Sequence, residues 1–401
     1  MYCVQPITPE ILYVGGSDRR LTLFENTYPL SRGVSYNAYL VLDEKTVLMD
    51  TVDWAIGERF FENLTHALQG RTLDYVVVNH MEPDHAATLG ELLRRYPDVQ
   101  VVGTAKTMAM IGQFFGMDLA GRGMTVKEGE TLTTGRHTFA FYMAPMVHWP
   151  EVMVTYDTTE KVLFCADAFG TFGALNGNLF ADEVDFPQDW LAEARRYYAN
   201  IVGKYGAQVQ ALLKKAAGLE IAMLCPLHGP IWRKDISWFV DKYQTWSTYM
   251  PEEQGVMIAC ASIYGHTEQA AEVVANRLAQ HGVRNIAMYD LSHHHVSEMV
   301  SEAFRWSHLV LASATYNNGL FTPMENLLLD LKAHNFQNRT VALMENGSWA
   351  PQAGKLMREA VEGMKNMRIL EPSITIKSAS GEDQRPALES LADAIAADLK
   401  G

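Results

Sequence analysis

The chain has few cysteines and no closely spaced pair of them. Its 401 residues include four, Cys3, Cys165, Cys225 and Cys260, and no two form a C-x-x-C pair. This spacing excludes a C-x-x-C metal knuckle or a zinc ribbon within the chain. Cys165 and Cys260 close apolar, strand-like segments and are predicted to be small core residues. A reducing cytoplasm is the predicted location.

The sequence also lacks long apolar segments and an excess of positive charge. No apolar run reaches the length of about 18 residues that a membrane span needs. No basic segment followed by an apolar one opens the chain, so neither a signal peptide nor a membrane span is predicted. The 33 Lys and Arg against 47 Asp and Glu give a net charge of −14. That charge argues against nucleic-acid binding and is compatible with a basic docking partner.

The chain contains enough hydrophobic residues to form two cores. Hydrophobic residues make up 48% of the chain, and its length predicts two or three domains. Residues 1–250 are predicted to form a first α/β domain with mixed sheets. Its expected strands are 39–42, 46–50, 73–78, 138–142, 152–156 and 161–165, and its expected helices are 55–69, 85–95, 190–202 and 237–249.

A second domain is predicted at 255–401, after a linker at 250–255 where proline and glycine bracket charged residues. There, strands and helices alternate strictly, which predicts a parallel, doubly wound sheet. The expected strands are 255–261, 286–289, 309–313, 340–344 and 373–376, and the expected helices are 267–281, 296–305, 324–332, 352–363 and 386–400.

One loop of the first domain concentrates side chains that bind metals. Asn79-His80-Met81-Glu82-Pro83-Asp84-His85 follows the apolar strand predicted at 73–78. Pro83 stiffens the loop, and His85 is expected to open the next helix. A solvated loop can be equally polar, but four possible ligands at the end of a buried strand favour a metal site. Three further candidates lie just after apolar segments: His148, Asp167 and His228.

These seven residues resemble the metal motif of the metallo-β-lactamase superfamily, H-x-H-x-D-H followed by H, D and H. The second position here is Glu82 instead of histidine. The set therefore holds three carboxylates and four imidazoles, a mixture that suits iron or manganese, whereas zinc hydrolases favour more histidine. Two metal ions about 3.5–4 Å apart would each keep an open position for a diatomic molecule.

H-x-E-x-D-H is the signature of flavodiiron proteins, so the chain resembles that family. The resemblance implies that His80, Glu82 and His148 bind the iron nearer the flavin and that Asp167 bridges to the second iron. It assigns Asp84, His85 and His228 to that second iron. In some members the histidine that matches His85 is turned away from the metal.

Two aromatic segments, 36–39 and 196–201, also resemble this family. Tyr198 is expected beside the metal centre, where it would donate a proton or a hydrogen bond. The alternative is that it packs in the core as an ordinary aromatic residue.

Three loops of the second domain fall where doubly wound folds bind ligands. The first opens a helix after strand 255–261, a position that suits a phosphate monoester, and it resembles the flavodoxin phosphate loop. The second resembles the S-P-T-x-N-N-G loop of the family, with Ala314 in place of proline. The third contains a glycine and Trp349, which is expected to cover the isoalloxazine edge. The candidate residues for flavin mononucleotide (FMN) are Ser262, Tyr264, Gly265, His266, Thr267, Ser313, Ala314, Thr315, Tyr316, Asn317, Asn318, Gly319, Asn346, Gly347, Ser348 and Trp349.

No G-x-G-x-x-G accompanies these loops, which argues against a Rossmann dinucleotide site. His293-His294-His295 is a second possible metal-binding segment, but it lies between a predicted strand and a predicted helix and is expected to be a solvated loop.

The resemblance covers nearly the whole chain and implies a two-domain oxidoreductase without a fused rubredoxin. The expected fold is a metallo-β-lactamase-like αββα sandwich followed by a flavodoxin-like domain. FMN would pass electrons from an external donor, rubredoxin or a deazaflavin coenzyme, to two non-haem irons. The centre would reduce dioxygen to water or nitric oxide to nitrous oxide. Members form head-to-tail dimers, so a homodimer or a tetramer is expected.

Two other functions remain open at this stage. The first is a dinuclear zinc hydrolase with an accessory FMN domain, against which Glu82 argues. The second is an electron carrier or gas sensor that uses the same cofactors without turnover.

Overall fold

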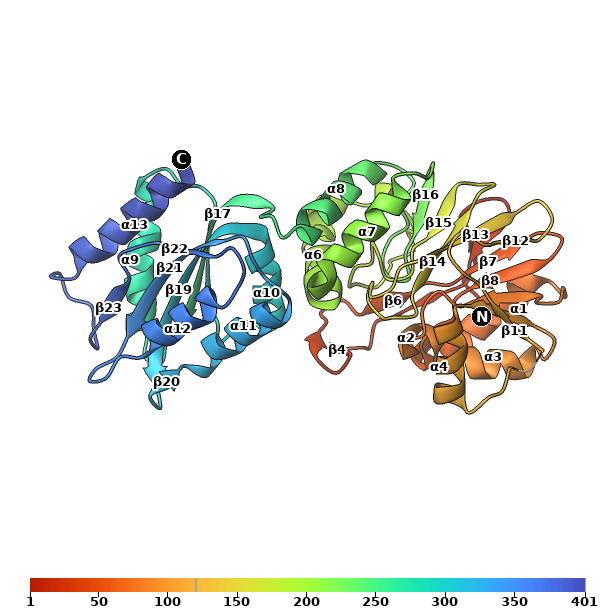
Figure 1. The fold of residues 1–401 in the computed structure, drawn as a ribbon, viewed down its shortest axis with the longest axis horizontal. Helices are drawn as coiled ribbons and strands as arrows, with labels where there is room; N and C mark the ends of the chain where they lie inside the picture. Colours follow the sequence, from red (N-terminus) through yellow and green to blue (C-terminus); the bar gives the residue numbers. More distant parts are fainter. Residues whose placement is uncertain (120, 401) are drawn as a thin grey trace. The chain divides into compact units, whose positions relative to one another are not determined.

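The computed structural model describes residues 1–119 and 121–400. The chain forms two compact units (Figure 1). The N-terminal unit contains Met1–Tyr198 and Ala207–Gln244, and the C-terminal unit contains Ala199–Gly206 and Thr245–Gly401. The short segment Ala199–Gly206 therefore groups with the second unit, although the sequence places it in the first predicted domain.

Two sheets form the centre of the N-terminal unit. The first has the order β1-β2-β7-β8-β9-β10-β11 and the second the order β12-β13-β14-β15-β16. Strands β7 to β10 of the first sheet are almost fully buried. Their residues are mostly apolar, as expected for strands that are covered on both faces. The strands of the first sheet are β1 (Gln5–Pro6), β2 (Ile11–Tyr13), β7 (Tyr39–Leu42), β8 (Thr46–Met49), β9 (Tyr75–Val77), β10 (Gln100–Gly103) and β11 (Gly123–Thr125). Those of the second are β12 (Thr131–Thr133), β13 (Thr138–Met143), β14 (Met153–Asp157), β15 (Val162–Phe164) and β16 (Met223–Cys225).

Helices lie outside both sheets, which gives an αββα arrangement (Figure 1). On the first sheet these are α1 (Gly57–Leu68), α3 (Leu89–Arg95) and α4 (Ala105–Phe115); on the second they are α7 (Gly206–Ala216) and α8 (Ile236–Ser247). Two small two-stranded antiparallel sheets, β3 (Gly16–Asp18) with β6 (Val34–Tyr36) and β4 (Leu23–Phe24) with β5 (Tyr28–Pro29), complete the unit.

The helix predicted at 85–95 is wrong in its bounds. It is split into α2 (Pro83–Ala86) and α3, and it begins two residues earlier than expected. Proline is favoured in the first turn of a helix, where its missing N–H costs nothing. Pro83 therefore starts a helical turn and does not merely stiffen a loop.

The helix predicted at 190–202 also differs. The α-helix α6 (Leu191–Tyr197) gives way to a π-helical segment at Tyr198–Val202. Such π-helical turns often occur at functional sites because they re-aim the side chains around them.

The C-terminal unit has the predicted parallel sheet, with the order β18-β17-β19-β21 followed by β22 and β23, which both pair with β21. Its strands are β17 (Glu253–Ala261), β18 (Ile286–Asp290), β19 (Trp306–Tyr316), β21 (Thr340–Asn346), β22 (Arg368–Ile369) and β23 (Ile374–Ile376). β20 (Gly319–Leu320) forms a hairpin with β19. The predicted linker ends earlier than expected, because β17 already begins at Glu253.

Helices cover both faces of this sheet. α9 (His266–Gln280) and α13 (Arg385–Lys400) pack together, and α10 (Val296–Arg305) packs with α11 (Thr322–Ala333), while α12 (Ala353–Glu362) contacts β21. The core between the sheet and the pair α9 and α13 consists mainly of aliphatic side chains, among them Val256, Val310 and Ile395.

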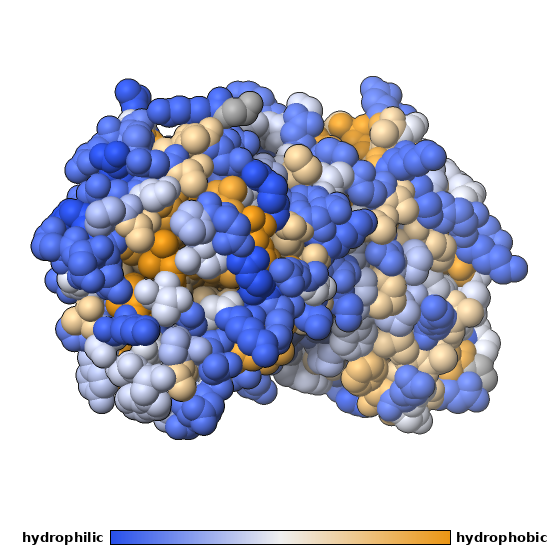
Figure 2. All heavy atoms as spheres, turned by 60° about the vertical axis from the view of Figure 1, so that its left-hand side comes forward, coloured by the Kyte–Doolittle hydropathy of each residue, from blue (hydrophilic) through white to orange (hydrophobic). Residues whose placement is uncertain are grey.

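Hydrophilic side chains cover much of the surface seen in Figure 2. Among the described residues, no helix combines the length and the apolar character that crossing a membrane requires.

Candidate functional site

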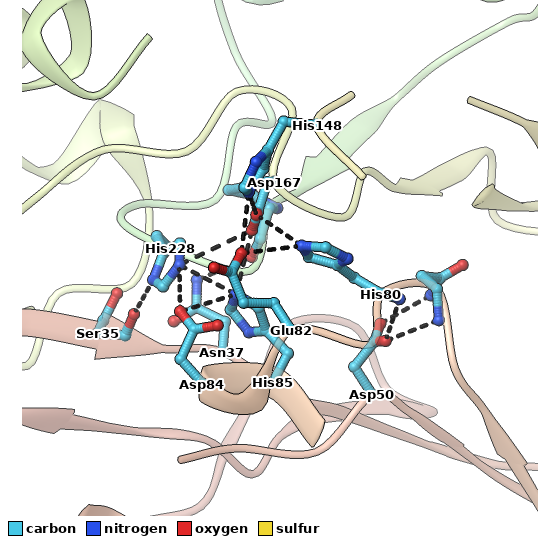
Figure 3. A network of polar contacts seen from close by, with 12 residues as sticks. Ser35, Asn37, Asp50, His80, Glu82, Asp84, His85, His148, Asp167 and His228 are labelled. Atoms are coloured by element: carbon cyan, nitrogen blue, oxygen red, sulfur yellow. Dashed lines mark hydrogen bonds and ion pairs between the residues drawn. The ribbon is translucent and has the colours of Figure 1, made fainter. Parts of the chain in front are cut away.

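The seven predicted metal ligands meet in one buried cluster of the N-terminal unit (Figure 3). They come from four separate segments, each located after a strand: the loop after β9 with α2, the β13–β14 connection, the loop after β15 and the loop after β16. Side-chain exposure is at most 13% for any of them. The fold therefore brings together residues that lie up to 148 positions apart, from 80 to 228.

The cluster divides into two groups of potential ligand atoms. One group is His80, Glu82, His148 and Asp167, and the other is Asp84, His85 and His228. In the first group the Nε2 atoms of His80 and His148 lie 3.2 and 2.9 Å from Glu82 Oε2. In the second group the Nε2 atoms of His85 and His228 lie 3.3 and 3.2 Å from Asp84 Oδ2.

Asp167 faces both groups with different oxygen atoms. Its Oδ2 lies 3.2 Å from Nε2 of His80 and 3.2 Å from Nε2 of His148. Its Oδ1 lies 3.1 Å from Nε2 of His85 and 3.7 Å from Nε2 of His228. A carboxylate that offers one oxygen to each of two ligand groups has the geometry of a bridge between two cations.

His85 points into this centre. Its Nε2 lies 3.0 Å from His228 Nε2 as well as near Asp84 and Asp167. In some members of the family the matching histidine is turned away from the metal. The side chain of His85 is not turned away from the other ligands.

The electrostatics of the cluster keep the Asp167 carboxylate ionised. Burial acts to raise the pKa of Asp167, but the imidazoles of His85 and His80 outweigh it and hold that pKa well below its usual value. Burial likewise acts against the charged form of His148, but Asp167 and Glu82 raise its pKa to about 9. A bound cation would take the place of the imidazole protons, since metal binding to histidine releases them.

The residues present fit a pair of metal ions. Both carboxyl oxygens of Asp84, Oδ1 of Asp167 and Nε2 of His148 are buried and form no hydrogen bond among the described residues. Other ligand atoms crowd them, at 2.9 Å from His148 Nε2 and at 3.2 and 3.3 Å from Asp84 Oδ2. Buried polar atoms without partners are costly. Cations between these crowded lone pairs would satisfy them, and mixed carboxylate and imidazole donors suit iron or manganese.

Asp50 supports the loop that carries the first ligands. Its Oδ1 accepts hydrogen bonds from the backbone N–H groups of Asn79 (2.7 Å) and His80 (3.2 Å), and its Oδ2 accepts one from Asn79 Nδ2 (2.8 Å). Burial raises the pKa of Asp50 to about 6, although Asn79 opposes this. Asp50 belongs to no recognisable sequence motif, and its position at the end of the predicted strand 46–50 is the only indication of its role in the sequence.

The segment at 36–39 holds the His228 loop. Asn37 Nδ2 donates to the carbonyl groups of Pro226 and Gly229, each at 2.9 Å. Ser35, just before this segment, accepts a 2.7 Å hydrogen bond from His228 Nδ1 at its backbone carbonyl oxygen. This segment therefore fixes the orientation of a ligand without being one.

Tyr197, which the sequence analysis did not single out, contacts the ligands. Its ring centroid lies 5.4 Å from that of His228. Burial raises its pKa far above the ordinary value and the Asp167 carboxylate adds to the shift, so the hydroxyl keeps its proton. The ring of Tyr198 packs against Tyr243, with centroids 5.0 Å apart. The ring of Tyr197 therefore lies against a candidate ligand, whereas the ring of the predicted Tyr198 packs on Tyr243.

The predicted flavin loops line a cavity of ≈ 500 Å³ in the C-terminal unit. The cavity lies at the carboxyl ends of β17, β19, β21 and β23, where flavodoxin-like sheets bind their ligand. Gly265, with φ 87°, precedes α9, and its N–H donates to Ser262 Oγ at 3.0 Å. The predicted residues on the lining are Ser262, Tyr264, His266, Thr267, Ala314, Thr315, Asn317, Asn318, Asn346, Gly347, Ser348 and Trp349.

Four of the predicted flavin residues lie off this lining: Gly265, Ser313, Tyr316 and Gly319. Ser313 is buried within β19, and its Oγ donates to the carbonyl of Ala314. Tyr316 and Gly319 pair with each other in the β19–β20 hairpin.

Ser378 is a lining residue that the sequence analysis missed. It follows β23 and exchanges hydrogen bonds with Asn346: its N–H donates to Oδ1 (3.1 Å), and its carbonyl accepts from Nδ2 (2.8 Å). The small residues after the strand predicted at 373–376 were the signal for this fourth loop. Ile263 and Ala350 also line the cavity.

The first unit has the fold and the clustered ligands of a dinuclear metal protein, and the second has the sheet and the loops of a flavodoxin. Together they define the class of two-cofactor redox proteins.

Three comparisons identify the family. The model of the ODP family beta lactamase matches residues 34–229. An anaerobic nitric oxide reductase flavorubredoxin from Aeromonas hydrophila is 32% identical over 346 residues, which cover 84% of this chain and 69% of that protein. The rubredoxin oxygen:oxidoreductase of Desulfovibrio gigas has a TM-score of 0.92 at 27% identity, over 99% of both chains. A flavo di-iron protein variant from Thermotoga maritima has a TM-score of 0.90 at 25% identity, over 99% of this chain and 98% of that one.

The chain therefore belongs to the flavodiiron protein family. This confirms the predicted fold class and the predicted class of enzyme, an oxidoreductase. FMN and a non-haem di-iron centre, the cofactors of that family, are those that the sequence predicts. The zinc hydrolase alternative is not favoured by these relatives.

Proposed function

We propose that this protein reduces dioxygen to water, nitric oxide to nitrous oxide, or both, at a di-iron centre supplied with electrons through FMN. The observation that carries the proposal is Asp167, which offers one carboxylate oxygen to each of two histidine-containing groups. The relatives named nitric oxide reductase and oxygen oxidoreductase support both gases as substrates.

The proposed ligands follow from the two groups. His80, Glu82 and His148 would hold one iron, Asp84, His85 and His228 would hold the other, and Asp167 would offer one oxygen to each. When bound, FMN and the two irons supply the electrons and the open positions at which a diatomic gas is reduced.

The protein's own residues contribute orientation, water exclusion and a proton. Asp50 and the segment at 35–37 hold the ligand loops by hydrogen bonds to backbone and imidazole. The ligand side chains are nearly closed off from solvent. The protonated hydroxyl of Tyr197 beside His228 is the proposed proton donor.

For the flavin, the proposed phosphate loop is Ser262–Thr267, where hydroxyl groups and backbone N–H groups precede α9. Tyr264 and Trp349 flank the cavity and are 89% and 90% exposed. Their flat rings suit stacking on an isoalloxazine.

An external donor, rubredoxin or a deazaflavin coenzyme, is proposed to reduce the flavin. The net charge of −14 suits a donor with a basic contact surface. The cytoplasm is the proposed location, which the four free cysteines support.

We propose a head-to-tail homodimer, alone or paired into a tetramer, in which the flavin of one subunit serves the irons of the other. The test is to co-express two inactive variants. One lacks the bridging carboxylate (Asp167→Ala), and the other has a disabled phosphate loop (Ser262→Ala with Thr267→Val). Mixed dimers regain gas reduction if electrons pass between subunits. Inactive mixed dimers that hold both cofactors would contradict the arrangement.

The function itself is tested by gas consumption. Anaerobically purified protein with reduced rubredoxin is expected to consume dioxygen, nitric oxide or both in the steady state. The variant Glu82→His recreates the histidine pattern of the hydrolases, so it should bind zinc more readily and lose gas reduction. Ester or thioester hydrolysis by the wild-type protein, without gas consumption, would contradict the proposal.

A further inference from the structure

The buried ligand histidines differ in what supports their second ring nitrogen. His80 Nδ1 lies 2.8 Å from Glu151 Oε1, whereas His228 Nδ1 donates to the carbonyl oxygen of Ser35 at 2.7 Å. His85 Nδ1 has no hydrogen-bond partner among the described residues. One of these three histidines is thus backed by a carboxylate, one by a neutral carbonyl group, and one by neither.

Glu151 is placed where two ligand segments meet. Its side chain is fully buried. The oxygen that faces His80 also accepts the backbone N–H of Met81 at 2.9 Å. Glu151 lies three residues after His148 and precedes β14. One carboxylate therefore ties the loop carrying His80 and Glu82 to the segment carrying His148.

This contact determines how His80 presents itself to a cation. A proton on Nδ1 that is donated to Glu151 leaves the lone pair on Nε2. Nε2 is the atom that lies 3.2 Å from both Glu82 and Asp167. A carboxylate behind a ligating histidine also makes the imidazole a stronger donor.

We propose that Glu151 is a positioning residue that makes the His80, Glu82, His148 and Asp167 group the tighter of the two metal sites. The proposal rests on the ligand assignment made above. It follows that the ion held by Asp84, His85 and His228 leaves first when metal is withdrawn. Glu151 is not itself counted as a ligand, because it belongs to neither group of clustered ligand atoms and its Oε1 faces His80 Nδ1 and the N–H of Met81.

The chain offers a matched control pair for this contact. His137 and Asp157, in the same unit, are a second fully buried histidine and carboxylate, with Nδ1 and Oδ2 2.6 Å apart. His137 is not one of the seven proposed ligands. Asp157→Asn therefore removes a comparable charge and disturbs a comparable pair without touching a ligand.

The experiment follows the loss of iron from holoprotein during incubation with a chelator. Wild-type protein should release its two irons in a fast and a slow phase. Glu151→Gln keeps an acceptor for both N–H groups but removes the charge, and should speed the slow phase about tenfold. Glu151→Leu removes the acceptor as well and should speed it further, up to about a hundredfold. Asp157→Asn should leave both phases as in the wild type.

A spectroscopic readout separates positioning from general loosening of the fold. In Mössbauer spectra of the di-ferrous holoprotein, Glu151→Gln should shift the signal of one iron and leave the other. Equal acceleration of both phases, the same acceleration in Asp157→Asn, or an unchanged slow phase would overturn the proposal. Wild-type protein without iron would instead refute the ligand assignment on which the proposal rests.

Discussion

The two sites of this protein are built in different ways. The candidate metal centre assembles seven side chains from four segments of the N-terminal unit. None of these side chains is more than 13% exposed. The flavin cavity assembles loops from one edge of one sheet, and the two aromatic residues beside it are about nine-tenths exposed. One site depends on converging side chains, the other on the position of loops.

This difference predicts unequal sensitivity to substitution. A buried convergent site depends on each ligand and on the residues that hold it, since an unpaired buried charge is costly. A loop site distributes its contacts over many backbone groups, so one side chain contributes little.

The bridging carboxylate should give the largest effect. Asp167→Ala removes the one residue that faces both ligand groups, so we expect loss of bound iron and a fall in gas reduction of ~100-fold or more. Metal analysis and steady-state gas consumption measure this. Replacing the exposed Asp98 by alanine is the control and should change neither. An Asp167→Ala protein that keeps two irons would show that the bridge is not required.

Asp50 should give the next largest effect, on stability. Asp50→Ala leaves three N–H donors in the interior without their acceptor. The loss should be about 2–5 kcal/mol in the free energy of unfolding, measured by urea denaturation of metal-free protein. An unchanged denaturation midpoint would mean that the ligand loop is held by other contacts.

The two adjacent tyrosines allow a direct comparison. Tyr197→Phe should lower gas reduction about tenfold or more while the iron content stays the same, because its ring packs against His228 and its hydroxyl keeps its proton. Tyr198→Phe, which changes the ring packed on Tyr243, should have a smaller effect. The reverse order would restore Tyr198 as the proton donor that the sequence suggested.

The flavin site should tolerate a comparable change. Trp349→Ala removes a ring that is 90% exposed, so we expect a loss of about 1 kcal/mol, or roughly fivefold in the Kd for FMN. Flavin fluorescence titration of the metal-loaded apoflavoprotein measures it. A loss of a hundredfold would mean that this site, too, depends on single side chains.

The smallest effect should come from a buried histidine outside both sites. His137 lies between Asp157 and Glu10, at 2.6 and 2.8 Å. Burial opposes its charged form, but these carboxylates raise its pKa from 6.5 to about 9. A raised pKa means that the folded state binds the proton more tightly. The stabilisation is therefore complete below about pH 6.5 and is lost as the pH rises through about 9. Thermal denaturation across this range should show that loss in the wild type, and a weaker dependence in Asp157→Asn.

The clustering of the seven candidate ligands and the second sheet were predictable from sequence because both follow regular patterns. α10 has the predicted bounds, since its apolar residues recur at helical spacing. Each candidate ligand follows an apolar strand, and these strands belong to the two sheets that form the centre of the N-terminal unit.

What the sequence did not reveal depends on contacts between distant segments. Glu151 and Asp50 form hydrogen bonds with the loop that carries His80. Glu151 lies 71 residues from its partner along the chain, and Asp50 lies 29 residues from its partner. The choice between Tyr197 and Tyr198 depends on the transition from α-helix to π-helix at that point. Ser378 reaches the flavin cavity through its pairing with Asn346, which a lone serine does not signal. Periodicity and motifs contain no information of this kind.

The most direct test of the central claim is the cofactor content of protein purified without oxygen. The two sites predict two irons and one FMN for each chain, with the iron lost in Asp167→Ala and the flavin retained there. Zinc in place of iron, or iron without FMN, would contradict the account.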